Sequence, residues 1–239
     1  MSGSALDADI ALNLSAVRRR IDAAARRASR SPESLRLIAV SKTFPIEAVL
    51  SAVQAGQRDF GENRVQEGLD KVAATSALSL VWHLIGHLQT NKARKAAAAF
   101  QWIHSVDSME LLKKLDSGAT DAGTRPQILL QADLAKETTK FGADRAELED
   151  LSRAAMDCRA LQLRGLMTVP PVAENPEDAR RWFVELRDLR DEMVARGLPA
   201  ESLSELSMGM SHDCEVAIEE GATMVRVGTA IFGRRTPPA

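Results

Sequence analysis

The sequence predicts an α/β fold, a single (β/α)₈ barrel of the TIM type with an extra N-terminal helix. Eight short apolar runs alternate with helical or turn-forming segments, the pattern of parallel strands joined by crossover helices. The chain has 239 residues, close to the roughly 250 of a typical barrel, and no linker or shift in composition divides it. An open doubly wound sheet is the alternative, but no Gly-x-Gly-x-x-Gly motif follows the first run. We therefore expect one domain over residues 1–239, with a leading helix in 1–31 and the barrel in 35–234.

The leading segment, from about residue 9 to residue 30, is predicted to be an amphipathic helix. Four branched apolar residues recur at helical spacing and form one stripe: Ile10, Leu14, Val17 and Ile21. The other face is strongly basic and carries Arg18, Arg19, Arg20, Arg26, Arg27 and Arg30. We interpret these arginines as a solvated face, with contact to nucleic acid or lipid as the alternative.

The first strand of the barrel is predicted at residues 37–40, a short and continuously apolar run that suits a strand buried on both faces. Pro45 ends this segment, and helical spacing resumes at residues 46–53. Lys42 therefore lies just past the carboxyl end of a parallel strand, the edge where barrel proteins build their sites. A lysine in this position is a candidate for a covalent bond with a carbonyl compound, although an ordinary solvated lysine is the alternative.

The remaining elements follow in order, each marked by its own periodicity and by breakers such as Gly56, Pro170 and Gly221. Further strands are expected at residues 58–63, 81–86, 102–106, 127–132, 163–168, 204–207 and 223–228. Further helices are expected at residues 65–72, 90–99, 109–115, 144–158, 176–196 and 212–220, and a polar loop at residues 136–142.

Composition excludes several classes of function. The formal net charge is -2, so no bulk electrostatic attraction to nucleic acid or to an anionic membrane is expected. The first residues lack the pattern of a signal peptide, and no run approaches the roughly 20 apolar residues of a membrane span. Cys158 and Cys214 belong to no Cys-x-x-Cys pair and are expected to be reduced thiols. We expect a cytoplasmic protein without nucleic-acid or membrane partners.

Two loops near the C-terminus are candidate phosphate-binding segments. Residues 207–211 and 228–233 combine glycines with Ser or Thr hydroxyls and each leads towards a helix start. Glycine lets a phosphate approach the backbone, while N–H and hydroxyl groups donate to its oxygens. Barrel enzymes often bind phosphate with the loops after strands seven and eight, so we favour this interpretation over two tight turns.

Arg226 lies within the eighth predicted strand and points to the face opposite Val225 and Val227. One of these two sets must face the barrel interior, and an inward arginine needs an anionic or acceptor partner. An internal ion pair and a ligand are the two candidate partners.

The histidines and the Ser211–His212–Asp213 sequence carry less information. His83 and His87 have the spacing of a helical metal pair, but they fall on a strand and a turn, and no carboxylate cluster completes a metal site. Three consecutive residues cannot form the hydrogen-bonded chain of a Ser-His-Asp triad. No metal or triad chemistry is predicted.

A series of motifs in order resembles the pyridoxal phosphate homeostasis protein family, whose members bind pyridoxal 5'-phosphate (PLP). The matching segments are residues 40–43 (VSKT), 60–67 (FGENRVQE), 82–92 (WHLIGHLQTNK), 165–171 (GLMTVPP), 206–211 (LSMGMS) and 224–232 (MVRVGTAIF). The resemblance spans about residues 35–234 and implies a barrel similar to the N-terminal domain of alanine racemases. It also implies that PLP is held as an internal aldimine on Lys42, with Arg226 facing the pyridine nitrogen.

By the same resemblance, Ser207, Gly228 and Thr229 hold the phosphate, while Asn63 and Met208 line the ring site. Alanine racemases use a tyrosine from a second domain as the base opposite the lysine, whereas this chain contains no tyrosine and ends after the eighth strand. His83 and Cys214 stay open as other candidate bases. The resemblance therefore implies a carrier of PLP without catalytic turnover, with apo forms of PLP-dependent enzymes as candidate recipients. The alternatives are a PLP-dependent racemase or lyase acting on amino acids and, more weakly, an RNA-binding role of the first helix. A monomer is expected.

Overall fold

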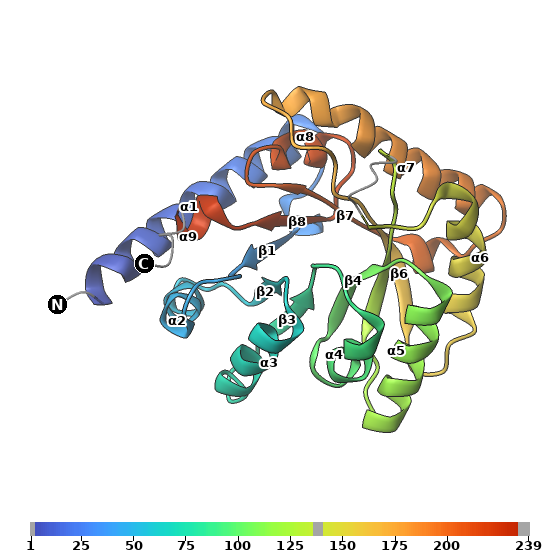
Figure 1. Cartoon of the computed structure of the whole chain (residues 1–239). Helices are drawn as coiled ribbons and strands as arrows, with labels where there is room; N and C mark the ends of the chain where they lie inside the picture. Colours follow the sequence, from blue (N-terminus) through green and yellow to red (C-terminus); the bar gives the residue numbers. More distant parts are fainter. Residues whose placement is uncertain (1–2, 136–140, 234–239) are drawn as a thin grey trace.

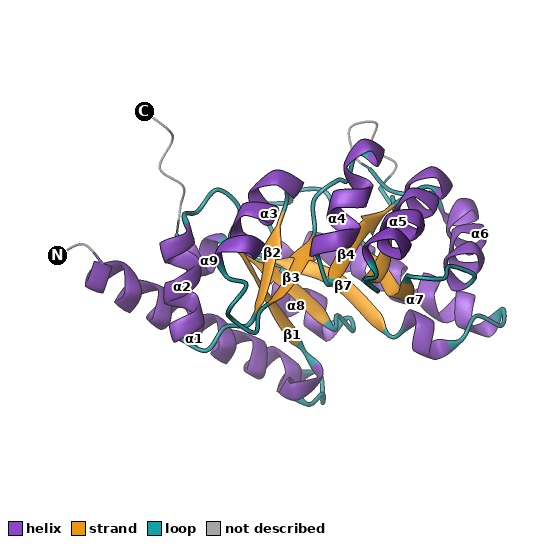
Figure 2. Cartoon of the chain, turned by 90° about the horizontal axis from the view of Figure 1, so that it is seen from below, coloured by secondary structure: helices purple, strands orange, loops and turns teal. Residues whose placement is uncertain are grey.

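The computed structural model describes residues 3–135 and 141–233 and shows a closed barrel of eight parallel strands surrounded by helices (Figures 1 and 2). The strands are β1 (Arg36–Val40), β2 (Asp59–Glu62), β3 (Val81–Leu84), β4 (Trp102–Val106), β5 (Gln127–Gln131), β6 (Gln162–Met167), β7 (Glu205–Met210) and β8 (Met224–Val227). The helices are α1 (Gly3–Arg27), α2 (Ile46–Gln54), α3 (Val65–Ala74), α4 (Ala93–Ala99), α5 (Met109–Ala122), α6 (Arg145–Met156), α7 (Arg180–Ala195), α8 (Cys214–Glu219) and α9 (Thr229–Phe232).

The barrel closes because β1 pairs with both β2 and β8, all in parallel. The predicted (β/α)₈ barrel with a leading helix is therefore confirmed. Several predicted boundaries were wrong. Helix α1 begins at Gly3 and not near residue 9, and the first turn of the predicted helix 176–196 is a 3-10 turn. The first turn of the predicted helix 90–99 is a 3-10 turn, α5 runs on to a left-handed Gly123, and β7 runs past residue 207 to Met210. Residues 136–140 of the predicted polar loop lie outside the described residues. So do the limits of the predicted domain at residues 1 and 239 and the predicted end of the barrel at residue 234.

Helix α1 lies along the β8–β1 side of the barrel, beside α2, α8 and α9 (Figure 1). Its predicted apolar stripe is buried: Ile10, Leu14, Val17 and Ile21 are 5% exposed or less. The interpretation of the arginines as a solvated face was wrong for Arg18, Arg20 and Arg30, which are half-buried, whereas Arg19, Arg26 and Arg27 are exposed. Arg20 pairs with Glu215 of α8 at 2.6 Å, and others bind the barrel through carbonyl and carboxylate groups: Arg18, Arg27 and Arg30. These bonds fix α1 against the barrel.

The barrel encloses a small apolar cluster of Ile38, Trp102, Leu129, Met167 and Met224, while the larger core fills the space between strands and helices. Buried polar side chains share the interior with this cluster: His83, His104, Ser207 and Arg226. Within residues 3–135 and 141–233, no helix is long and apolar enough to cross a membrane.

Candidate functional site

Lys42 follows β1 at the carboxyl end of the barrel, beside the segment that follows β8. A Cβ atom on Gly228 would lie 3.3 Å from the carbonyl oxygen of Val40, so these two segments touch. The ring centroids of Phe44 and Phe232, which lie on the two segments, are 5.2 Å apart. The predicted covalent lysine and the second predicted phosphate loop are therefore neighbours.

A buried ion-pair network fixes the backbone before Lys42. Lys71 Nζ donates hydrogen bonds to Ser41 O at 2.8 Å, to Glu62 Oε1 at 2.6 Å and to Glu67 Oε1 at 2.9 Å. The three protons of this ammonium group are thereby used. Ser41 Oγ donates to the same Glu62 oxygen at 2.6 Å. Burial raises the pKa of Glu62, and the hydrogen bonds from Lys71 and Ser41 oppose that shift.

The same network fixes the residue after Lys42. Thr43 has a φ of 67°, a left-handed conformation that is rare for a β-branched residue. Such a conformation costs about 1–3 kcal/mol and persists where surrounding contacts hold it. Here Glu67 Oε1 accepts a hydrogen bond from the backbone N–H of Thr43. Lys42 thus lies in a turn that is held on both sides.

Arg226 faces the barrel interior and is 4% exposed. Its Nη1 donates to Ser207 Oγ at 2.6 Å and its Nη2 donates to Thr168 O at 2.8 Å, both neutral groups. Burial lowers its pKa to about 10, an effect that the negative charge of Asp213 opposes. The internal ion pair considered above is not found among the described residues, so an anionic or acceptor ligand would stabilise this cation.

Ser207 and Met208 are both fully buried, and their surroundings differ from those of a phosphate loop. Ser207 Oγ contacts Arg226 and lies 2.9 Å from His104 Nδ1, while Met208 belongs to the core between strands and helices. The reason is a break in the register of β7 at Gly209, whose φ is 88°. The strand continues beyond it, so the turn begins later than the sequence suggested.

Ser211, which the sequence reasoning did not select, lies in the turn after β7 and joins the two predicted phosphate loops. Its Oγ accepts hydrogen bonds from the N–H groups of Gly228 at 3.2 Å and Ala230 at 3.5 Å. The hydroxyl proton of Ser211 is available to donate, because both of these bonds use its lone pairs. Thr229 is exposed in the same segment. The sequence signal was present in residues 207–211 (SMGMS), where either of the two serines could be the one that binds a phosphate.

Asn63 follows β2 and lines a cavity of about 210 Å³ together with Gly86, His87, Gln131 and other residues. Its Oδ1 is buried and has no hydrogen-bond partner among the described residues. A Cβ atom on Gly86 would lie 2.3 Å from Asn63 O, so this approach requires glycine. An unpartnered buried amide oxygen is costly, and a ligand with a donor group would satisfy it.

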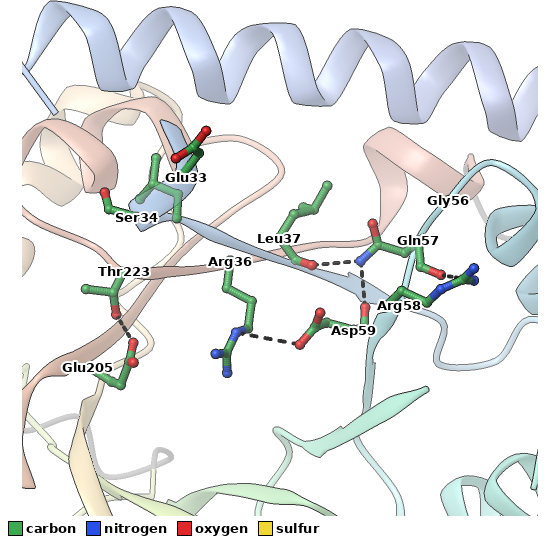
Figure 3. Close-up of a pocket in the computed structure, with 11 residues that line it drawn as sticks. Glu33, Ser34, Arg36, Leu37, Gly56, Gln57, Arg58, Asp59, Glu205 and Thr223 are labelled. Atoms are coloured by element: carbon green, nitrogen blue, oxygen red, sulfur yellow. Dashed lines mark hydrogen bonds and ion pairs between the residues drawn. The ribbon is translucent and has the colours of Figure 1, made fainter. Parts of the chain in front are cut away.

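A second cavity, of about 500 Å³, lies at the opposite end of the barrel (Figure 3). Arg36 and Asp59, which lie 3.6 Å apart, line it, and so do Thr223 and Glu205, which share a hydrogen bond of 2.6 Å (Figure 3). These residues belong to the amino-terminal ends of the strands. This cavity is therefore not part of the Lys42 site.

The two other candidate bases, His83 and Cys214, are buried in contacts with other residues. His83 is fully buried inside the barrel, and its pKa is lowered by that burial. Cys214 is buried on α8 against Glu215 and Arg20, and burial raises its pKa to about 12. Both cysteines are free thiols, as predicted. Within the described residues, no group of His, Cys, Asp and Glu side chains is arranged to bind a metal ion.

Comparison with known proteins gives a consistent result. Residues 12–236 match the family model of the alanine racemase N-terminal domain. The pyridoxal phosphate homeostasis protein of Escherichia coli K12 is 43% identical over 230 residues, which are 95% of this chain and 97% of that protein. The protein of the same name from Pseudomonas aeruginosa is 45% identical over 228 residues, 95% of this chain and 96% of that one.

Solved structures agree with this comparison. The structure of PipY from Synechococcus elongatus with PLP bound matches with a TM-score of 0.81 at 42% identity, covering 94% of this chain and 100% of that one. An alanine racemase of Clostridium difficile 630 matches with a TM-score of 0.73 at 15% identity, covering 96% of this chain and 57% of that one. At this low identity, the match to the alanine racemase shows a shared fold alone.

Proposed function

This chain belongs to the pyridoxal phosphate homeostasis protein family, and from that membership we propose that it binds PLP covalently through Lys42 and acts in PLP homeostasis. In this role it stores and delivers the cofactor and does not transform amino acids. The observation that carries the proposal is the convergence of Lys42, Arg226 and the turns after β7 and β8 at the carboxyl ends of adjacent strands. The PLP-bound structure of PipY supports it.

The residues present fit PLP. The cofactor supplies an aldehyde that condenses with an amine, with loss of water, and a ring nitrogen and a phosphate that need partners. Lys42 Nζ is the proposed amine, and Arg226, a buried cation bonded to neutral groups, is the proposed partner of the ring nitrogen. A charged guanidinium at that nitrogen leaves it unprotonated, which weakens the ring as an electron sink.

For the phosphate we propose Ser211 and Thr229 as hydroxyl donors and Gly228 as the residue that leaves room for it. Ser207 is proposed to act through Arg226, and Met208 through packing that supports β7. The unpartnered amide oxygen of Asn63 supports a role for this residue beside the ring.

A carrier role is supported by the absence of tyrosine from the 239 residues and by the burial of His83 and Cys214 in other contacts. Titration of the purified protein with PLP is expected to develop the visible absorbance of a lysine-bound cofactor, without racemisation or breakdown of added alanine. Multiple turnover of alanine would instead establish the enzyme alternative. A protein that stays colourless would overturn the proposal.

Replacing Ser211 with alanine is expected to weaken PLP binding about 10- to 150-fold, because a hydrogen bond to a charged group is lost. Pyridoxal, which lacks the phosphate, should bind the Ser211→Ala variant as it binds the native protein. Ser207→Ala is the matched comparison and should weaken PLP and pyridoxal alike, since Ser207 acts through Arg226. A selective loss of PLP binding in Ser207→Ala, with Ser211→Ala unaffected, would assign the phosphate to Ser207.

We also propose a cytoplasmic monomer that hands PLP to apo forms of PLP-dependent enzymes. The large apolar side chains that the described residues expose come from separate elements, among them Leu12 of α1, Leu50 of α2 and Met156 of α6, which supports a monomer.

A further inference from the structure

A chain of hydrogen bonds crosses the inside of the barrel from one end to the other. It leads from Arg226 Nη1 to Ser207 Oγ at 2.6 Å, and from Ser207 Oγ to His104 Nδ1 at 2.9 Å. His104 Nε2 lies 3.0 Å from His83 Nδ1, and His83 Nε2 lies 3.0 Å from Asp59 Oδ1. Arg226, Ser207 and both histidines are buried, whereas the side chain of Asp59 is 23% exposed. The carboxyl end of the barrel is thereby connected to the cavity shown in Figure 3.

With both rings neutral, the two ends of the chain determine the direction of every bond. Arginine can only donate hydrogen bonds, and an ionised aspartate can only accept them. His83 therefore donates its Nε2–H to Asp59, and its Nδ1 must accept from His104 Nε2–H. The Nδ1 of His104 must then accept from the hydroxyl of Ser207, which in turn accepts from Arg226. In the opposite direction, a lone pair of His83 would face the carboxylate.

Each neutral ring accordingly carries its single proton on Nε2. Burial lowers the pKa of His83 and lowers that of His104 further below its usual value, which agrees with neutral rings. Asp59 and Glu205 favour the charged form of His83, and Arg36 opposes it. At His104 the charged form is opposed by His83, Arg226 and Arg36. Arg36 lies over the ring of Trp102, with its guanidinium carbon 4.9 Å from the ring centroid.

We propose that Asp59 is a positioning residue for Arg226, acting across the barrel through His83, His104 and Ser207. The carboxylate is the acceptor that keeps the chain in one direction, so that the hydroxyl proton of Ser207 goes to His104 and both of its lone pairs are left for Arg226. The consequence for the ring nitrogen of PLP rests on the proposed function. The direction of the hydrogen bonds does not.

The direction is tested on the protein without cofactor by ¹⁵N NMR of the histidine side chains. Both rings are expected to show the Nε2–H tautomer and no titration between about pH 5.5 and 8.5, the range in which an ordinary histidine titrates. Substitution of each histidine by glutamine assigns the signals. An Nδ1–H tautomer at His104, or a protonated ring at neutral pH, would overturn the inference.

The coupling is tested with Asp59→Asn, because an asparagine amide has the same size but can also donate. In this variant the chain can reverse, so we expect a mixed tautomer at His104 and PLP binding weakened about 2- to 30-fold. The matched control is Glu33→Gln, the same chemical change at an exposed residue that lines the same cavity. It should leave both observables unchanged.

A double-mutant cycle separates this coupling from a general loss of structure. The effect of Asp59→Asn on PLP affinity should disappear in a Ser207→Ala background, because the chain is then already interrupted. If Asp59→Asn behaves like Glu33→Gln in a protein that binds PLP, the inference fails. If the native protein does not bind PLP at all, the proposed function fails while the tautomers still decide the direction. If Asp59→Asn does not fold, the native tautomers alone decide.

Discussion

Replacing Lys42 with alanine is expected to abolish the visible absorbance band of lysine-bound PLP at every cofactor concentration. The reason is that Lys42 is the proposed amine of the covalent bond, and Lys71, which binds the carbonyl group of the preceding residue Ser41, cannot replace it. The ammonium group of Lys71 donates to Ser41, Glu62 and Glu67 and is 8% exposed. The measurement is an absorbance titration of apo protein with PLP.

The control for this experiment is Lys92→Ala, which removes an exposed lysine that follows β3 and should leave the absorbance unchanged. Retention of the full band in Lys42→Ala would show that another amine holds the cofactor. The phosphate contacts should survive in Lys42→Ala, so weak non-covalent binding of PLP is still expected by calorimetry.

Replacing Lys71 with methionine is expected to lower the free energy of unfolding by about 3–5 kcal/mol, because it leaves the fully buried Glu62 without its charge partner. The double variant Glu62→Gln/Lys71→Met should recover much of this loss, since the amide is neutral and still accepts the Ser41 hydroxyl bond. The measurement is unfolding in urea followed by circular dichroism.

The matched control is Lys114→Met. Lys114 pairs with Glu110 four residues before it on a helix, the same spacing as that of Lys71 and Glu67. Lys114 and Glu110 lie 3.3 Å apart, but their side chains are 50% and 67% exposed. This substitution should change stability by less than about 1 kcal/mol. Equal effects of Lys71→Met and Lys114→Met would contradict the buried network. The recovered double variant should still bind PLP more weakly, because nothing then joins Ser41 to Glu67.

Much of the fold could be predicted from the sequence, because each buried parallel strand is a short apolar run and each run is followed by a change of period. The position of Lys42 at the end of β1 follows from the same pattern. The residue at which β7 ends could not be predicted. A short strand that ends at Ser207 and a longer one that passes through Gly209 differ only in a local backbone angle, which decides that Ser211 and not Ser207 lies in the turn.

Other parts of the site depend on distant segments that only the closed barrel brings together. His83 and His104 are polar residues in two mostly apolar runs, and nothing in either run predicts that the two rings lie 3.0 Å apart. The position of Lys71 in its helix suggests an exposed residue, yet Lys71 is buried because α3 packs closely against Phe100 and Glu62. A Cβ atom on Gly68 of that helix would lie 2.3 Å from the ring of Phe100. The sequence likewise does not show that α8 lies beside α1, where its carboxylates pair with Arg20 and Arg27.

Borohydride reduction of the PLP-loaded protein, followed by proteolysis and peptide mass mapping, tests the central claim most directly. Reduction makes the bond between the cofactor and its lysine permanent, so the modified residue can be read from the peptide masses. The account predicts a pyridoxyl group on Lys42 in stoichiometric yield. A pyridoxyl group on Lys71 or on exposed lysines instead, or no modified lysine in a protein that retains PLP, would contradict it.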